Sequence, residues 1–335
     1  MKRVILDVPF SDCEYYPCDR VAVDALLGFY GYPMPLVLHD EWGFLYQRPK
    51  NGDVRVVCRF TSLLQGLQRC GISVAEHQES NGDIAWANAR ARIQHGHPVA
   101  AMADTYHLEK HYYPGLGHHS RHYIILAGYD DEAETVHVVD PSWIVRFRGN
   151  LSLHALGEAW GSQAIAPYKW VDCRFSKLQW TLSPKEAIQT VRQNVEMMLQ
   201  KQADECGRFT GIHGMRMLAA DLIRWKHLES DVPRSLLGQL FNQLRSVVIE
   251  RDGHSRFLEL SAAIVKDPRF VQAGDELKTI TQKWLVFRNL CLKGQKKALT
   301  PILDKLHGRL LEIAALEENA LARLERIVSS SATVG

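Results

Sequence analysis

Residues 17–31 read PCDRVAVDALLGFYG, and this stretch places a cysteine at the entrance of a predicted helix. After the helix-breaking Pro17, apolar side chains recur with spacings of three and four residues, which is the pattern of one helix face. The Asp19 side chain can accept hydrogen bonds from the unpaired amides of the first helical turn, and Gly31 ends the helix. A thiol at this N-terminus meets the positive end of the helix dipole, which favours the thiolate. The alternative is that Cys18 is a buried structural thiol.

Size and composition are those of a globular protein that is large enough for two domains. The chain has 335 residues, of which 46% are hydrophobic and 23% are charged. A net charge of +2 gives no reason to expect a nucleic acid or a membrane surface as partner. The N-terminal apolar run is too short for a signal peptide, and no stretch approaches the roughly 20 apolar residues of a membrane helix. Seven scattered cysteines without a CxxC pair indicate reduced thiols, so we expect a cytoplasmic protein.

The local patterns divide the chain near residue 180. Before this point strand-like and helical segments alternate, including strand-like runs at 41–46 and 54–60. From Ser183-Pro184-Lys185-Glu186, a helix-capping signal, nearly everything has a helical period. We therefore predict an α+β domain over 1–178 and an all-α helical bundle domain over 179–328. Residues 329–335 are predicted to be a flexible tail, and the long last helix either packs within the bundle or forms a homodimer.

A β-hairpin is predicted where two apolar runs, 123–129 and 135–139, flank the turn sequence DDEAE. His122 opens the first strand and Asp140 ends the second, so both belong at the same end of the sheet. The pattern does not specify the faces on which they lie.

A thiol nucleophile needs an imidazole base, and the base needs a group that orients it. Cys18, His122 and Asp140 therefore form a candidate catalytic triad. In the alternative interpretation, His122 caps a strand and Asp140 begins a turn. Cys13 is the rival nucleophile, but no helix begins after it.

Clustered histidines before the hairpin first suggest a metal site. His107 and His111 have the spacing of a helical ligand pair, but no cysteine or pair of carboxylates completes a tetrahedral set. We therefore expect no metal, and we interpret the other histidines, His118 and His119 among them, as a polar loop.

Several of these motifs resemble a known family. The pattern of Cys18 with Tyr30-Gly31, and the segments 122–130 and 138–141, resemble papain-like bacterial cysteine enzymes related to bacteriocin-processing peptidases. The runs 41–46 and 104–113 more narrowly resemble the N-terminal domain of the butirosin biosynthesis protein H family. In that family the domain precedes a helical domain, whose landmarks resemble the segment Gly253-His254-Ser255-Arg256-Phe257 and Trp284.

The resemblance implies a papain-like fold with an antiparallel sheet, and it implies acyl transfer in specialised-metabolite biosynthesis of the polyketide, nonribosomal-peptide or aminoglycoside type. Cys18 would take an acyl or peptidyl group from the phosphopantetheine thioester of a carrier protein, His122 would act as base and then acid, and Asp140 would hold the ring. The implied partners are a carrier protein and a small-molecule amine acceptor, with no cofactor of the protein's own. Two alternatives stay open: a cysteine peptidase, amidase or thioesterase that uses water, and a non-catalytic binding or scaffolding protein.

Further residues are candidates for substrate contacts. The oxyanion hole would combine the Cys18 amide with a group from the preceding loop, which has no glutamine; Ser11 and Asp12 are its nearest polar residues. The remaining candidates each have a structural alternative. Glu41 either contacts an acceptor amine or caps a strand. Tyr106 and Tyr113 either line a pocket or pack against other side chains. Trp143 either shields the Asp–His pair from water or lies in the core.

Overall fold

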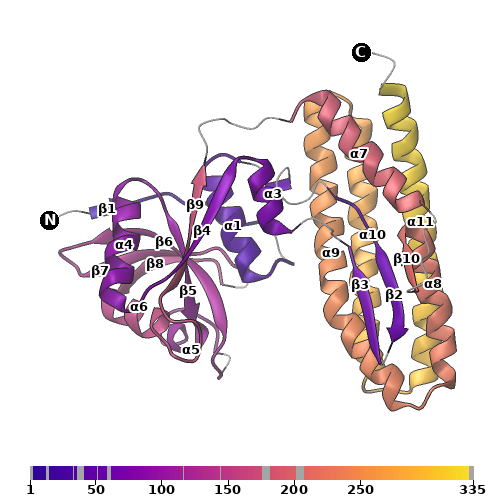
Figure 1. Cartoon of the computed structure of the whole chain (residues 1–335), viewed down its shortest axis with the longest axis horizontal. Helices are drawn as coiled ribbons and strands as arrows, with labels where there is room; N and C mark the ends of the chain where they lie inside the picture. Colours follow the sequence, from indigo (N-terminus) through magenta and orange to yellow (C-terminus); the bar gives the residue numbers. More distant parts are fainter. Residues whose placement is uncertain are drawn as a thin grey trace. The chain divides into compact units, whose positions relative to one another are not determined.

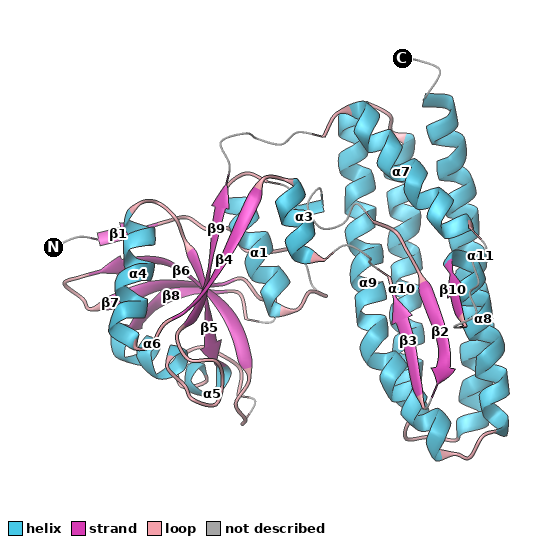
Figure 2. Ribbon diagram, in the orientation of Figure 1, coloured by secondary structure: helices cyan, strands magenta, loops and turns pink. Residues whose placement is uncertain are grey.

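The computed structural model describes residues 3–12, 15–32, 34–35, 41–50, 52–58, 62–115, 117–143, 145–175, 182–200 and 207–331. The chain forms two compact units, each built from two separate segments. The first unit is Met1–Met34 with Leu67–Gln179, and the second is Pro35–Gly66 with Trp180–Gly335. An antiparallel sheet dominates the first unit and helices dominate the second, which confirms the predicted α+β class (Figure 1, Figure 2).

Within the described ranges, the first unit is a seven-stranded antiparallel sheet with helices packed on it. The strands run in the order β4-β9-β5-β6-β7-β8, and β1 also pairs with β6. The strands are β1 (Arg3–Ile5), β4 (Ile72–Gln78), β5 (Val99–Asp104), β6 (Arg121–Asp130), β7 (Thr135–Asp140), β8 (Phe147–Ser152) and β9 (Lys169–Phe175). The helices are α1 (Cys18–Phe29), α4 (Gly82–Gln94), α5 (Thr105–Leu108) and α6 (Leu153–Trp160), while α3 (Leu63–Arg69) contains the boundary between the units.

Both faces of the sheet are covered at the strand β5, because all six of its residues are buried. One face forms a core with α4 and α6, which includes Ile124 and Leu126 of β6 and Val136 and Val138 of β7. Helix α1 contacts β5 and β6, and Figure 1 shows it on the other side of the sheet from α4.

The predicted hairpin is confirmed as β6 and β7, which pair from Asp130↔Thr135 to Ile125↔Val139. The register shifts between Leu126 and Gly128, where β1 also lies against β6. A side chain at Gly128 would collide with the Val4 carbonyl of β1, so the sequence needs glycine there.

The second unit combines a helical bundle with a small antiparallel sheet. Within the described ranges its helices are α7 (Pro184–Leu199), α8 (Gly211–Arg224), the 3-10 turn η1 (Trp225–His227), α9 (Asp231–Val265), α10 (Arg269–Gly294) and α11 (Leu299–Ser331). The strands β10 (Arg208–Thr210), β2 (Leu45–Lys50) and β3 (Asp53–Val57) add a three-stranded sheet that the sequence analysis did not place here. Helix α7 begins with the predicted capping box of Ser183 and Glu186. No helix in the described ranges has the length and apolar character needed to span a bilayer.

These two units differ from the predicted division at residue 178, because residues 35–66 fold with the helices of the second unit. The β2–β3 hairpin contacts α8 and α9, and its Tyr46, Val54 and Val56 side chains are buried. The helical part of the chain also extends beyond the predicted start of the tail. Helix α11 continues to Ser331, and 332–335 lies outside the described residues.

Candidate active site

Cys18 is the first residue of α1, as predicted. Pro17 precedes it in an extended conformation (φ −67°, ψ 157°) and provides no side-chain cap. Its carbonyl accepts the first helical hydrogen bond, from the Val21 amide at 3.0 Å. The half-buried Cys18 thiol lies 4.0 Å from the Arg121 carbonyl oxygen at the start of β6. The helix N-terminus thus holds the thiol beside the end of the central strand that carries His122.

His122 and Asp140 form a buried hydrogen-bonded pair. His122 Nε2 lies 2.8 Å from Asp140 Oδ2, and the two residues are 4% and 0% exposed. The other carboxylate oxygen accepts from the Ser142 amide at 3.1 Å, which fixes the carboxylate. Because side chains alternate along a strand, His122 lies on the face of Ile124, and Asp140 on the face of Val138. The structure therefore supplies what the hairpin pattern left open: both side chains emerge on the same face.

Cys18 and His122 interact, and each shifts the other's pKa. Burial alone would raise the pKa of the Cys18 thiol, but hydrogen bonding and charge from His122, with the Tyr123 amide, lower it below its ordinary value. Burial alone would lower the pKa of His122, but its hydrogen bonds to Asp140 and Cys18 raise it to about 9. With Nε2 bound to Asp140, Nδ1 is the ring nitrogen left for the thiol. This environment stabilises a thiolate beside an imidazolium.

Tyr112 and Tyr113 lie near the His122–Asp140 pair. The Tyr113 ring lies edge-on to the His122 ring, with centroids 4.9 Å apart. Tyr112 stacks on Phe147 at 3.9 Å, and Phe147 lies opposite Asp140 in the β7–β8 register. Burial and the nearby Asp140 charge raise the pKa of both phenols, so both are neutral near pH 7. Tyr113 thus contacts the site, whereas Tyr106 is 42% exposed and packs with His107 and His119.

The other predicted site residues lie in varied surroundings. Ser11 is buried, and its hydroxyl donates to Asp24 Oδ2 of α1 at 2.5 Å. Asp12 is exposed and lies 3.7 Å from Arg146. The Ser11 hydrogen bond ties the segment before Cys18 to α1. The rival nucleophile Cys13 lies outside the described residues.

Glu41 belongs to the second unit, whereas Trp143 follows Asp140 in the first. Trp143 is 49% exposed, so it is not a core residue. Sequence reasoning also missed a polar group formed by Asp104, His107 and His119. Their possible ligand atoms lie within 4.8 Å of one another. The sequence analysis considered His107 only together with His111, because of their helical spacing, and expected no metal. The available signal was an aspartate that ends a fully buried strand shortly before a histidine.

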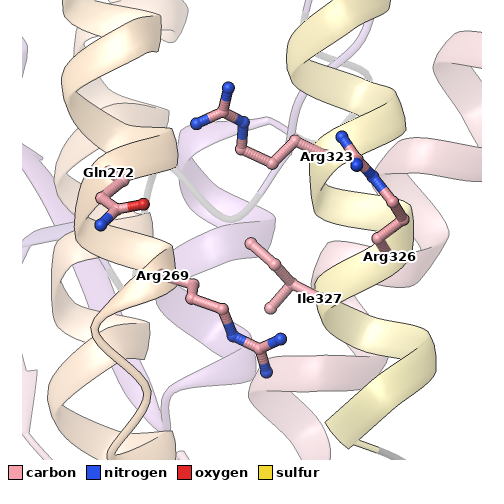
Figure 3. A pocket seen from close by; sticks show the side chains of 5 residues that line it. All are labelled: Arg269, Gln272, Arg323, Arg326 and Ile327. Atoms are coloured by element: carbon pink, nitrogen blue, oxygen red, sulfur yellow. The ribbon is translucent and has the colours of Figure 1, made fainter.

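A cavity of about 410 Å³ in the second unit is rich in arginine (Figure 3). Two of its guanidinium groups already form ion pairs, Arg269 with Asp267 at 2.6 Å and Arg323 with Glu276 at 2.7 Å. Figure 3 shows guanidinium groups that point in different directions and do not converge on one ligand position. The lining residues are Arg269, Gln272, Arg323, Arg326 and Ile327.

Two family models match the sequence and together span most of it. Residues 17–141 match the N-terminal domain of butirosin biosynthesis protein H, and this range runs from just before Cys18 to just after Asp140. Residues 174–324 match a domain of unknown function, DUF4872. No curated protein matches the chain.

Proposed function

Because the chain belongs to the butirosin biosynthesis protein H family, we propose that it is a cysteine-dependent acyltransferase. The proposed reaction moves an acyl or peptidyl group from the phosphopantetheine thioester of a carrier protein to an amine. The supporting observation is the buried His122–Asp140 pair beside Cys18 at a helix N-terminus. Perturbed pKa values cluster at functional sites, so the lowered pKa of this thiol favours an enzyme over a scaffolding protein.

In the first step of the proposed reaction, the Cys18 thiolate attacks the thioester carbonyl carbon. The carbon–sulfur bond to phosphopantetheine breaks, and the protonated His122 donates its proton to the departing pantetheine thiolate. Exchange of one thioester for another is nearly balanced in energy. The barrier therefore depends mainly on positioning and on stabilisation of the oxyanion, for which the Cys18 amide at the start of α1 is a suitable donor.

In the second step, an acceptor amine attacks the Cys18 acyl-enzyme. His122, now neutral, accepts the proton that the amine loses, and Cys18 leaves as a thiolate paired with imidazolium. Asp140 keeps the imidazole oriented through both steps, because its carboxylate is itself fixed by the Ser142 amide. If water took the place of the amine, the same residues would make a hydrolase.

Intact-mass measurement with an acyl-pantetheine thioester tests the proposal. We expect the wild-type chain to gain the acyl mass on Cys18, and a small-molecule amine to remove it as the amide. Cys18→Ala should gain no mass, and His122→Ala should acylate at least about 100-fold more slowly.

His118→Ala is the matched control, because it changes a histidine of the preceding loop and should acylate at the wild-type rate. Release of the acyl group only as the free acid, with every amine tested, would indicate a hydrolase. An absence of any Cys18 adduct in a folded protein would contradict both enzymatic functions.

A further inference from the structure

Asp104, His107 and His119 bring three potential metal ligands together away from the Cys18 thiol. Asp104 ends β5, His107 lies on α5, and His119 lies two residues before β6. One polar atom from each falls within 4.8 Å of those of the other two. We propose that these side chains bind a divalent transition-metal ion of the zinc type.

The donor set matches such an ion. Two imidazoles and a carboxylate are ordinary ligands of zinc, which often keeps water at a fourth position. Among the described residues, His107 Nδ1 is buried and has no hydrogen-bond partner, a costly state that metal coordination would relieve. The His119 side chain is 48% exposed, so the site has a solvent side through which an ion and water can enter.

The carboxylate is already held in place by other groups. Asp104 is fully buried, and its Oδ1 accepts from the Tyr106 and Ser120 amides at 3.2 and 3.3 Å. Its Oδ2 accepts from the Ser162 hydroxyl at 2.6 Å. Such outer hydrogen bonds orient a metal-binding carboxylate before the ion arrives.

One local adjustment is required. His119 Nδ1 now lies 2.7 Å from Asp104 Oδ2, whereas two ligand atoms of one tetrahedral zinc lie roughly 3.3 Å apart. His119 must therefore move by a fraction of an ångström or bind through Nε2, and its exposure permits either. The ion would replace the His119–Asp104 hydrogen bond.

The location suggests a structural consequence. The three ligands lie at the two ends of the loop that joins β5 to β6, and the Thr105 amide already donates to the Ser120 carbonyl there at 3.0 Å. The same loop carries Tyr113, which lies against His122. A bound ion would clamp the base of this loop without taking part in chemistry at Cys18, so the proposal is independent of the proposed acyl transfer.

Zinc titration of the full-length chain by isothermal calorimetry tests the site. Cys18→Ser is used as the background, because the Cys18–His122 pair could itself bind zinc. We expect one zinc per chain and a higher thermal unfolding midpoint in its presence. His119→Gln and His107→Gln should each weaken zinc binding at least about tenfold, which is the effect typical of losing a metal-site interaction.

His111→Gln and His118→Gln are the matched controls, since both change histidines of the same loop and should leave zinc affinity unchanged. His119→Gln also guards against a folding artefact, because this half-exposed side chain can be replaced without opening the core. The proposal is overturned if the Cys18→Ser chain, prepared without zinc, binds none in the titration. It is also overturned if the control substitutions weaken zinc binding as much as the ligand substitutions do.

Discussion

At the residue scale, Cys18 and His122 change each other's ionisation in opposite directions. The thiol pKa is lowered and the imidazole pKa is raised to about 9, which leaves a pH range between the two values in which the ion pair predominates. The N-terminus of α1 favours the same state, because its dipole stabilises negative charge. The site therefore favours a thiolate and a protonated imidazole at the same pH, which is the state that the proposed acyl transfer requires.

The first prediction concerns the pH dependence of Cys18 alkylation by iodoacetamide. The thiolate forms as pH rises through a lowered pKa, so the rate should reach its plateau at lower pH than that of an ordinary thiol. His122→Ala removes the largest causes of the lowering and leaves burial, which raises the pKa of the thiol, so alkylation at pH 7 should slow at least about tenfold. Acylation by a thioester should instead decline as pH rises through about 9, where His122 loses the proton that the leaving thiol needs. An unchanged alkylation profile in His122→Ala would contradict the coupling.

The second prediction separates charge from orientation at Asp140. Asp140→Asn keeps an oxygen that can accept from His122 Nε2, so the ring keeps its orientation and loses only its charged partner. We expect the acylation rate to fall by about tenfold or less, with the alkaline decline at lower pH. Asp140→Ala removes the acceptor and should cost about 100-fold. Rates of acyl-enzyme formation, followed by intact mass at several pH values, measure both effects. Equal losses in the two variants would show that the charge dominates.

Cys18, His122 and Asp140 were proposed from the sequence because each lies at the start or end of a regular element, and the structure brings the three side chains together. Positions of this kind follow from local patterns. The direction of a side chain in a loop does not, which is why Tyr106 and Tyr113 carried equal weight although only Tyr113 contacts His122. Ser11 is a similar case, because its partner Asp24 lies on α1.

At the scale of elements, the backbone at the outer edge of β3 forms hydrogen bonds with side chains of helix α9, where another strand would otherwise pair. Gln243 accepts from the Val56 amide at 2.6 Å and donates to the Val54 carbonyl at 2.8 Å. Gln239 accepts from the Val54 amide at 2.9 Å and donates to the Gly52 carbonyl at 3.0 Å. Residues four apart on a helix and two apart on a strand both advance about 6 Å, so the two rows match. An edge strand that would otherwise leave its backbone groups unpaired is thereby satisfied.

The third prediction follows from this match. Gln239→Ala combined with Gln243→Ala should destabilise the protein by about 2–4 kcal/mol, at about 1 kcal/mol for each hydrogen bond removed. The urea midpoint measures the loss, and faster hydrogen exchange at the Val54 and Val56 amides locates it. Gln272→Ala, on α10, is the control and should change stability by less than about 0.5 kcal/mol. Unchanged amide exchange in the double variant would show that β3 does not depend on α9.

The strand-like runs predicted at 41–46 and 54–60 overlap β2 and β3, but the core against which these strands pack was not predicted. Alternation around Val54 and Val56 marks a strand with one buried face, and it says nothing of which helices bury that face. The partners, α8 and α9, lie more than 150 residues later in the chain. Only contacts between such distant segments assign 35–66 to the second unit.

At the scale of the whole molecule, a buried charged cluster ties the 42–44 segment into the second unit. Arg251 and Glu317 are both fully buried and form two hydrogen bonds, at 2.9 and 3.0 Å. Glu317 also accepts from the Trp42 and Trp284 indoles at 3.2 and 2.7 Å, and Arg251 donates to the Gly43 carbonyl at 2.8 Å. A buried ion pair is tolerable only when its remaining polar groups are satisfied, and here the 42–44 segment satisfies two of them.

The family models and the compact units divide the chain at different residues, because buried contacts join segments that are far apart in the sequence. The butirosin biosynthesis protein H match at 17–141 includes the hairpin that folds with the helices, whereas the second match begins at 174. A matching range follows the continuous sequence, but a folding unit follows buried contacts. Removal of 1–178 would therefore take away part of the second unit as well.

The fourth prediction tests this division with two fragments. A fragment of residues 179–335 lacks the Trp42 indole and the Gly43 carbonyl, and it leaves Gln239 and Gln243 without their strand. We expect it to be destabilised by at least about 3 kcal/mol relative to a matched chain in which 35–66 is fused before 180–335 through a flexible glycine–serine linker. Urea unfolding followed by circular dichroism measures both. Introducing Glu317→Ala into the fused chain should remove most of the gain, because it leaves Arg251 as a buried unpaired charge. Equal urea midpoints for the two fragments would mean that the helices fold without the hairpin, and that 35–66 is held by the second unit without supporting it.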